Sequence, residues 1–311
     1  MTGAIDASTA SRRTEREGDA SDVSGAPPTN DERADRAAAN ERYEALIESS
    51  TCNYVCRPED RVDRPALFRK QDQDVDKIDE HDVKQNQLED CALMAALAGL
   101  ARTPEGRAVI ENAIKENKNE KGEVVSYTVT LHKPQERYGG LGAKTFTPVS
   151  VTVDGQFVCG HARARTDGNG SEVWPLVIER AFHEYKDRDY GMCNGDVKRG
   201  GPPMIAMELL TGNEAHQFRL WSFAGYKHYS SQDLQNDVDA GKIVVLDTKE
   251  KFAGDNPYGL IDFHAYVVTG TENCRGTLYV NLHNPDDSGD VRVPFKDLED
   301  WFVAVDIGSV R

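Results

Sequence analysis

The stretch QNQLEDCALMAALAGLA, residues 85–101, decides how this chain is interpreted. Polar residues lead up to Cys91 and an uncharged, apolar run follows it, which predicts a buried helix with this cysteine in its first turn. The first amide groups of a helix lack internal partners and the helix dipole is positive there, so a thiolate is stabilised relative to a thiol. We therefore expect Cys91 to ionise more easily than an ordinary cysteine.

A lone cysteine among apolar residues is more often a small core residue than a nucleophile, so further elements are needed. A reactive thiol requires an imidazole to exchange protons with, and a third group that holds the imidazole in its working tautomer. Of the eight histidines, His264 stands out. The segment GLIDFHAYVVTG, residues 259–270, sets it at the start of an apolar, β-branched run typical of a buried strand.

A second strand is predicted in TLYVNLHNP, residues 277–285. If the two runs pair as an antiparallel hairpin with its turn centred near Cys274, His264 and Asn284 lie about opposite one another, roughly 5 Å apart. Asn284 can then orient the imidazole, although most Asn-Pro pairs simply end a strand. His283 and Asn281 are weaker candidates for the same roles.

Gln85 precedes the candidate nucleophile by six residues. A side-chain amide there can donate a hydrogen bond to the oxyanion that forms when a thiolate attacks a carbonyl, alongside the backbone amide of Cys91. Taken alone, a glutamine at this spacing carries little information.

Together these segments resemble the calpain family of papain-like thiol proteases, from about Asp82 to Arg311 and in the family's order. Besides the segments already quoted, the resemblance rests on EHDVKQN (80–86), SEVWPLVIERAFHEYKDRDYG (171–191), GGPPMIAMELLTG (200–212) and VPFKDLEDWFVAVDIG (293–308). It implies that Cys91 is the nucleophile, His264 the general acid and base, Asn284 the orienting group and Gln85 the oxyanion donor.

The chain departs from the family pattern at four positions. Ala92 and Asp286 stand where the family usually has tryptophan, and Asn86 and Glu89 replace glycines. The tryptophan after the Asn-Pro pair shields the imidazole from water in the family, so its absence here bears on catalytic efficiency. The two replaced glycines narrow or recharge the floor of the cleft.

The same resemblance implies a calcium site in the first lobe, with Asp82 and Glu172 as carboxylate ligands. The alternative is a solvated acidic loop that holds no ion. The nearby acidic run QDQDVDKIDEHDV imitates an EF-hand but lacks its glycine and its final glutamate, since Lys77 and Val83 stand there. The chemistry itself requires no cofactor.

The expected fold is α+β, a papain-like two-lobed arrangement. A helical lobe, approximately residues 65–200, carries the nucleophile, and an antiparallel sheet lobe, residues 201–311, carries the histidine and asparagine. The first lobe is predicted to hold a helix from Pro104 to Asn117, strands in EVVSYTVTLHKP and TPVSVTVD and a helix around Trp174. The second is predicted to hold GKIVVLDT, HAYVVTG, TLYVNLH and FVAVDIG as strands. Residues 1–50 are polar and are expected to form a disordered or weakly helical tail ahead of the core at 51–311.

The net charge of −16 and the sequence pI of about 5.0 argue against binding to phosphate backbones, so nucleic acid is not an expected partner. The six cysteines lack disulfide spacing, and a zinc site from Cys52, Cys56, Cys159 and His161 lacks a second close cysteine pair. No signal peptide or membrane span is recognised. We expect a protein that works in the cytoplasm, its own or that of a cell into which it is delivered as an effector or toxin. The sequence carries no indication of oligomeric state.

The leading hypothesis is an endopeptidase that cuts protein substrates at limited sites through an acyl-enzyme. One alternative is transglutaminase-type acyl transfer or deamidation of protein glutamine, because a thiol, an imidazole and a carboxamide serve that chemistry as well. The other is a degenerate protease that only binds a partner.

Overall fold

A computed structural model of the chain describes residues 60–62, 64–70, 76–135, 143–155, 157, 162–167, 170–186, 201–220, 229–286 and 288–310. All of them belong to one compact unit, Leu46–Arg311. The predicted tail and the four residues of the zinc alternative lie outside the described part of the chain.

Helix α2, Cys91–Ala101, begins at the cysteine, as the sequence predicts. Every residue after Cys91 in this helix is buried, which explains why the segment carries no charge. Helix α3, Pro104–Ala113, follows after a turn in which the Thr103 hydroxyl accepts a hydrogen bond from the Gly106 amide. The predicted helix from Pro104 to Asn117 is therefore too long at its end. Residues Ile114–Lys118 form strand β1 instead, because they pair with the long strand that follows.

A three-stranded antiparallel sheet is formed by β1, β2 (Val124–Gln135) and β3 (Thr145–Asp154), in that order. Both longer strands match the sequence predictions. Along β3, Val151 and Val153 are buried while Thr152 and Asp154 are exposed, so one face of the sheet meets the core and the other meets water.

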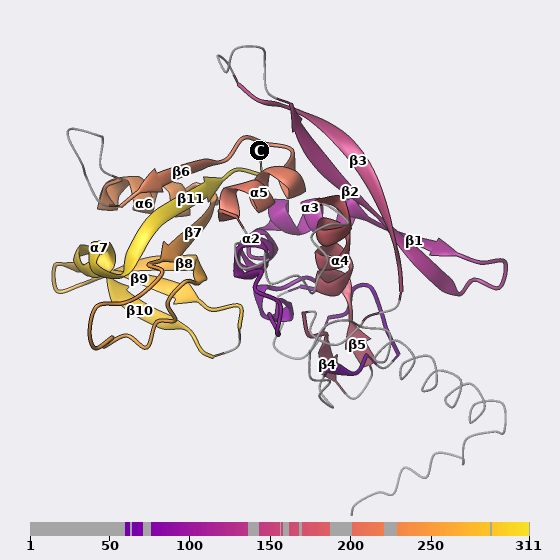
Figure 1. The fold of residues 1–311 in the computed structure, drawn as a ribbon, viewed down its shortest axis with the longest axis horizontal. Helices are drawn as coiled ribbons and strands as arrows, with labels where there is room; N and C mark the ends of the chain where they lie inside the picture. Colours follow the sequence, from indigo (N-terminus) through magenta and orange to yellow (C-terminus); the bar gives the residue numbers. More distant parts are fainter. Residues whose placement is uncertain are drawn as a thin grey trace, which may run out of the picture. The chain divides into compact units, whose positions relative to one another are not determined.

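A six-stranded antiparallel sheet has the order β10-β9-β8-β7-β11-β6 (Figure 1). Its strands are β6 (His216–Arg219), β7 (Ile243–Thr248), β8 (Ala265–Cys274), β9 (Thr277–His283), β10 (Val291–Pro294) and β11 (Phe302–Gly308). The four strands predicted for one antiparallel sheet are confirmed. Strands β6 and β10, which lie at its two edges, are not recognisable from the sequence because each is only four residues long.

Both faces of this sheet are covered, and the alternation along β7 shows how. Ile243 and Val245 pack into a core with the residues of α2, whereas Val244 and Leu246 pack into a second core with Phe302 and Val305 of β11. This explains why the strand reads as a continuous apolar run. Helix α2 therefore lies directly against β7 and β8.

The remaining described elements are short, apart from two helices that complete the first core. They are η2 (Glu80–Asp82), β4 (Arg165–Asp167), β5 (Gly170–Glu172), α4 (Trp174–Lys186), α5 (Pro203–Thr211), α6 (Ser231–Asp239), η4 (Phe295–Asp297) and α7 (Leu298–Trp301). Trp174 at the start of α4 is completely buried. Within the described ranges, no helix has the length and apolarity that a membrane span requires.

Candidate active site

Cys91 lies at a cavity of about 660 Å³. The cavity is also lined by His264 and Gln85, so three of the four predicted catalytic residues share one space. Within the described part of the chain, no hydrogen bond joins the Cys91 sulfur to the His264 ring. In this conformation the thiol and the imidazole face the same cavity without forming an ion pair.

The expectation that Cys91 ionises easily is wrong for this conformation. Burial raises the pKa of the thiol to about 12, and the negative charges of Asp90 and Asp247 add to the effect. Hydrogen bonds from the backbone amides of Ala265 and Ala92 act in the opposite direction but do not compensate. The helix N-terminus does favour the thiolate, but the loss of water and two nearby carboxyl groups outweigh it.

Asp247 is itself unusual, because its carboxyl group is hydrogen-bonded to that of Asp306, which lies two residues along strand β11 from Ala304, the cross-strand partner of Asp247. Burial and the charge of Asp306 raise the pKa of Asp247 well above its usual range, and burial also raises the pKa of Asp306. Two carboxyl groups in contact cannot both ionise cheaply, so the pair holds a shared proton.

His264 and Asn284 meet as predicted: the His264 Nε2 atom lies 2.7 Å from the Asn284 Oδ1 atom. The hairpin that brings them together has a different register from the predicted one. Cys274 pairs with Thr277, so the turn consists of Arg275 and Gly276, both with positive φ, rather than being centred near Cys274. His264 lies two residues away from the position directly opposite Asn284, so the two residues are diagonal neighbours across the strand pair. Their side chains are long enough to meet across this diagonal.

The orientation of the Asn284 amide is fixed by two further hydrogen bonds. Its Oδ1 atom also accepts from the backbone amide of Asp286, and its Nδ2 atom donates to the Ser288 hydroxyl. A backbone amide can only donate, so the atom facing His264 is the amide oxygen and the His264 Nε2 atom carries the proton. The Nδ1 atom is then free to accept a proton from a thiol, which is the tautomer that nucleophilic catalysis requires.

Burial lowers the pKa of His264, although the hydrogen bond to Asn284 and the charge of Asp286 raise it in part. The imidazole is therefore neutral at neutral pH. Thr248 holds the backbone on one side, since its hydroxyl accepts from the His264 amide at 2.7 Å. The Tyr266 ring stands edge-on to the imidazole, with ring centroids 5.0 Å apart.

Gln85 is buried, and its Nε2 atom donates to the Leu88 carbonyl at 2.7 Å. Its Oε1 atom has no hydrogen-bond partner within the described residues. One N–H of the amide is thus already engaged, and the role of oxyanion donor stays a prediction. The backbone amide of Gln85 donates to the Pro285 carbonyl at 2.7 Å, so the segment before Cys91 is joined to the segment after Asn284.

Asp90, the residue before Cys91, forms a buried cluster with Glu179 and His183. The His183 Nε2 atom lies 3.1 Å from Asp90 Oδ2, and both Glu179 oxygens accept from the Ala162 amide. Burial and the charge of Asp90 raise the pKa of Glu179 well above its usual range. Burial alone would lower the pKa of His183, but the bond to Asp90 and the two carboxyl charges raise it. The cluster therefore holds protons that offset its buried negative charge.

The two residues that the family resemblance assigns to calcium are engaged by protein groups. Asp82 is completely buried, and its oxygens accept from Arg165 Nη1 at 3.1 Å, from Trp174 Nε1 at 3.3 Å and from the Asp79 amide at 2.7 Å. Glu172 accepts from the Arg69 amide. The Arg165 guanidinium thus occupies the place beside Asp82 where the calcium ion is expected. In this arrangement the residues do not form a calcium site. Calcium could bind Asp82 only if Arg165 moved away, so the calcium site stays a prediction. The alternative of a solvated acidic loop does not describe Asp82 either, because its side chain is buried.

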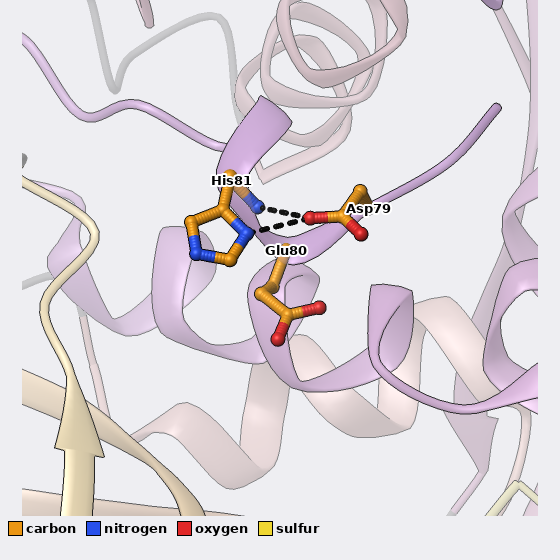
Figure 2. Close-up of side chains that lie close together, drawn as sticks. All are labelled: Asp79, Glu80 and His81. Atoms are coloured by element: carbon orange, nitrogen blue, oxygen red, sulfur yellow. Dashed lines mark hydrogen bonds and ion pairs between the residues drawn. The ribbon is translucent and has the colours of Figure 1, made fainter. Parts of the chain in front are cut away.

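Asp79, Glu80 and His81 also lie close enough together to hold a metal ion (Figure 2). Figure 2 shows the Asp79 carboxylate turned toward both the backbone and the ring of His81, at 3.1 Å and 2.6 Å, while the Glu80 side chain points elsewhere. Asp79 is the N-cap of η2, so its carboxylate already has a structural task. The His81 ring contacts that of His283, whose Nδ1 atom pairs with Asp290, so neither histidine competes with His264 for the cavity.

Several residues of the site are not recognisable from the sequence. Thr248 and Ser288 support the His264–Asn284 pair, but a hydroxyl in a strand or a turn gives no signal in one sequence. The cavity is also lined by four acidic residues from three separate segments, Glu89, Asp247, Glu250 and Asp262. Only the fold brings these together.

A family model described as "Calpain family cysteine protease" matches residues 55–302. Calpain-7 of Sus scrofa is 23% identical over 246 residues, which cover 74% of this chain and 27% of that protein. Calpain-7 of Mus musculus and of Homo sapiens are each 22% identical over 255 residues, which cover 76% of this chain and 28% of those proteins. The chain thus spans only about a quarter of the length of these relatives. The family match extends over most of the chain, and the chain therefore belongs to the calpain family of cysteine proteases.

Proposed function

We propose that this protein is a cysteine endopeptidase that cleaves polypeptides, with Cys91 as nucleophile, His264 as general base and acid, and Asn284 as orienting group. The observation that carries the proposal is the 2.7 Å hydrogen bond from His264 to Asn284, at a cavity that Cys91 also lines. This bond sets the tautomer in which the imidazole can take a proton from a thiol. We also infer the papain-like arrangement of two lobes, which the packing of α2 against β7 and β8 supports as the contact between them.

The resting charges determine how the reaction begins. The thiol and the imidazole are both neutral, so the His264 Nδ1 atom accepts the thiol proton while the sulfur attacks the scissile carbonyl. A carbon–sulfur bond forms and the carbonyl oxygen becomes an oxyanion, which the Cys91 amide and the Gln85 side chain can stabilise. His264 then returns the proton to the leaving amine as the peptide bond breaks. Water, deprotonated by the same imidazole, hydrolyses the thioester.

The test is cleavage by the whole purified chain, comparing the native sequence with a Cys91→Ala variant. We expect new amino termini, in the chain itself or in an unfolded protein substrate, which mass spectrometry detects and which disappear in the variant. Cys274→Ala is the matched control, because that cysteine is free, exposed and outside the cavity. Release of ammonia from glutamine while all chains stay intact would instead establish deamidation.

A second candidate function is a binding module without catalysis. The thiol pKa of about 12 favours it, because a protonated thiol is a weak nucleophile. Ala92 and Asp286, which replace the tryptophans usual in the family, point in the same direction. An epoxide or vinyl-sulfone thiol probe distinguishes the two: labelling of Cys91 in the folded chain supports the enzyme, and folded protein that stays unlabelled there supports the binder.

A further inference from the structure

The cavity at Cys91 has a strongly one-sided charge. Glu89, Glu250 and Asp262 are exposed at it, and Asp247 is partly buried within it. No lysine or arginine is among the described residues that line the cavity. None of these four carboxyl groups forms an ion pair with a lysine or arginine in the part of the chain that the structure describes. The charges of the three exposed carboxylates, Glu89, Glu250 and Asp262, are therefore available to a ligand that enters the cavity.

A second observation points to a ligand with hydrogen-bond donors. The Gln85 side chain is 8% exposed, lines the same cavity, and leaves its Oε1 atom without a partner within the described residues. A buried acceptor without a donor costs about 1–3 kcal/mol in general, a cost that an N–H group of a ligand removes once the Gln85 amide turns toward the cavity. Carboxylates and an amide oxygen are all acceptors, so the cavity favours a group that only donates.

A third observation concerns the apolar part of such a group. Phe263 lines the cavity and is 52% exposed, although it is a large aromatic residue. Its φ of 51° is rare for a residue with a side chain. A hydrogen bond from its backbone amide to the Lys249 carbonyl, at 2.8 Å, holds the backbone on one side of it. An exposed ring beside carboxylates suits the aliphatic stem and cationic head of arginine or lysine.

We propose that this cavity selects polypeptide segments that carry an arginine or lysine side chain within about two residues of the scissile bond, a substrate class that rests on the proposed protease function. The volume of about 660 Å³ is enough for one or two residues and does not admit a folded domain. The net charge of −16 adds a long-range attraction for basic segments.

A cationic side chain does more than bind. Asp247 contributes to the raised pKa of the Cys91 thiol, and a guanidinium near the Asp247–Asp306 pair offsets part of the one negative charge that the pair keeps while it shares a proton. The substrate's own cation then makes the thiol easier to deprotonate as His264 accepts its proton. The preference is therefore expected in kcat as well as in KM.

The test uses peptides with a single arginine, placed at successive positions in an alanine- and leucine-containing sequence, each compared with its citrulline counterpart. Citrulline has nearly the shape of arginine but no charge. We expect kcat/KM to be 10- to 100-fold higher for the best arginine peptide, with the ratio falling as salt is raised because the rim carboxylates are exposed. Glu250→Gln and Asp262→Asn are expected to lower the ratio several-fold. Glu120→Gln, an exposed residue outside the cavity, removes the same charge and is expected to leave the ratio unchanged.

Binding to the Cys91→Ala variant separates this inference from the proposed function. Tighter binding of the arginine peptide than of the citrulline peptide supports the cationic site, whether or not the native chain cleaves either. Equal binding of the two peptides, or equal cleavage of both by an active enzyme, overturns it. Absence of cleavage together with selective binding leaves the cationic site standing and counts against the protease alone.

Discussion

The imidazole side and the thiol side of the candidate site are built in opposite ways. On the imidazole side, hydrogen bonds hold each group in place, from Thr248 to His264 to Asn284 to Ser288. On the thiol side, Cys91 lies at the start of α2, and its ionisation is opposed first by burial and then by the charges of Asp90 and Asp247. The candidate base is held in place and the candidate nucleophile is kept protonated, so the surroundings oppose ionisation of the sulfur more than they oppose proton uptake by the imidazole.

The largest effect is expected for His264→Ala, which removes the proposed catalytic base. Without a group to take the thiol proton, proteolysis should fall by about 10³-fold or more, because removing one member of a catalytic triad costs nearly as much as removing all. The measurement is kcat/KM on a cleavable peptide, with His216→Ala, an exposed histidine on β6, as the control. Loss of less than tenfold in a folded variant would show that His264 is not the base.

A smaller effect is expected for Asn284→Ala, which keeps the imidazole of His264 but removes the hydrogen bond that fixes its tautomer. We expect kcat to fall by about 10²-fold with little change in KM, since an orienting group acts on the reacting state and does not bind the substrate. Ser288→Ala, which removes only the support of the Asn284 amide, should cost a few-fold. If both variants retain full kcat, the hydrogen-bond chain has no catalytic role.

The restraint on the sulfur is tested by its reaction with iodoacetamide as a function of pH. A thiol pKa of about 12 means that the rate should still rise at pH 10, without the plateau that an ion-paired thiolate shows near neutrality. Asp247→Asn removes a carboxyl group that opposes the thiolate once the pH exceeds its raised pKa, and should raise the rate at pH 10 several-fold. Asp239→Asn on α6 is the control. A plateau below pH 8 in the native chain contradicts the assignment of a neutral thiol.

The loss of activity at acidic pH is expected to depend on the protonation of His264. Because burial lowers the pKa of His264 from 6.5, the imidazole stays neutral and able to accept a proton below that pH. Activity should therefore persist down to a pH below 6.5 and be lost only as the pH falls through the lowered pKa. An acid limb of kcat/KM centred above pH 6.5 would show that the imidazole is charged at rest.

The smallest effect on catalysis is expected away from the cavity, at Arg165. Replacing it with glutamine leaves the buried Asp82 carboxylate without its guanidinium and should reduce the free energy of unfolding by about 3 kcal/mol. Calcium should restore thermal stability to Arg165→Gln and leave the melting temperature of the native chain unchanged. A native chain that calcium stabilises strongly would show that the ion displaces Arg165, as the family resemblance implies.

The sequence locates the parts of this site better than it locates their surroundings. Periodicity and the apolar run place Cys91 at the start of a helix and His264 at the start of a strand, because both signals are local. The predicted hairpin register differs from the observed one by two residues. Composition alone does not distinguish a turn at Cys274 from the observed turn of Arg275 and Gly276, which is combined with a bulge near Thr269. The pairing of His264 with Asn284 survives the error because long side chains reach a diagonal neighbour.

Charge environment is what the sequence could not supply. A helix N-terminus argues for an acidic thiol, but Asp247 lies more than 150 residues along the chain from Cys91 and reaches it only through the packing of α2 on β7. The engagement of Asp82 by Arg165 has the same origin, as the two residues are 83 positions apart. Predictions of ionisation from local sequence fail where distant segments bring in opposing charge.

Gly99 in α2 determines how closely this helix packs against strands β7 and β8. A methyl group at Gly99 would lie 2.6 Å from Ile243 Cγ2 and 3.1 Å from Val267 Cγ2, both on the strands that continue toward Asp247 and flank His264. The helix can rest on those strands only because that methyl is missing. Gly99→Ala would push the helix away from the strands about two turns from the Cys91 sulfur. A single added carbon atom, in contact with neither group, would thereby change the distance between the thiol and the imidazole.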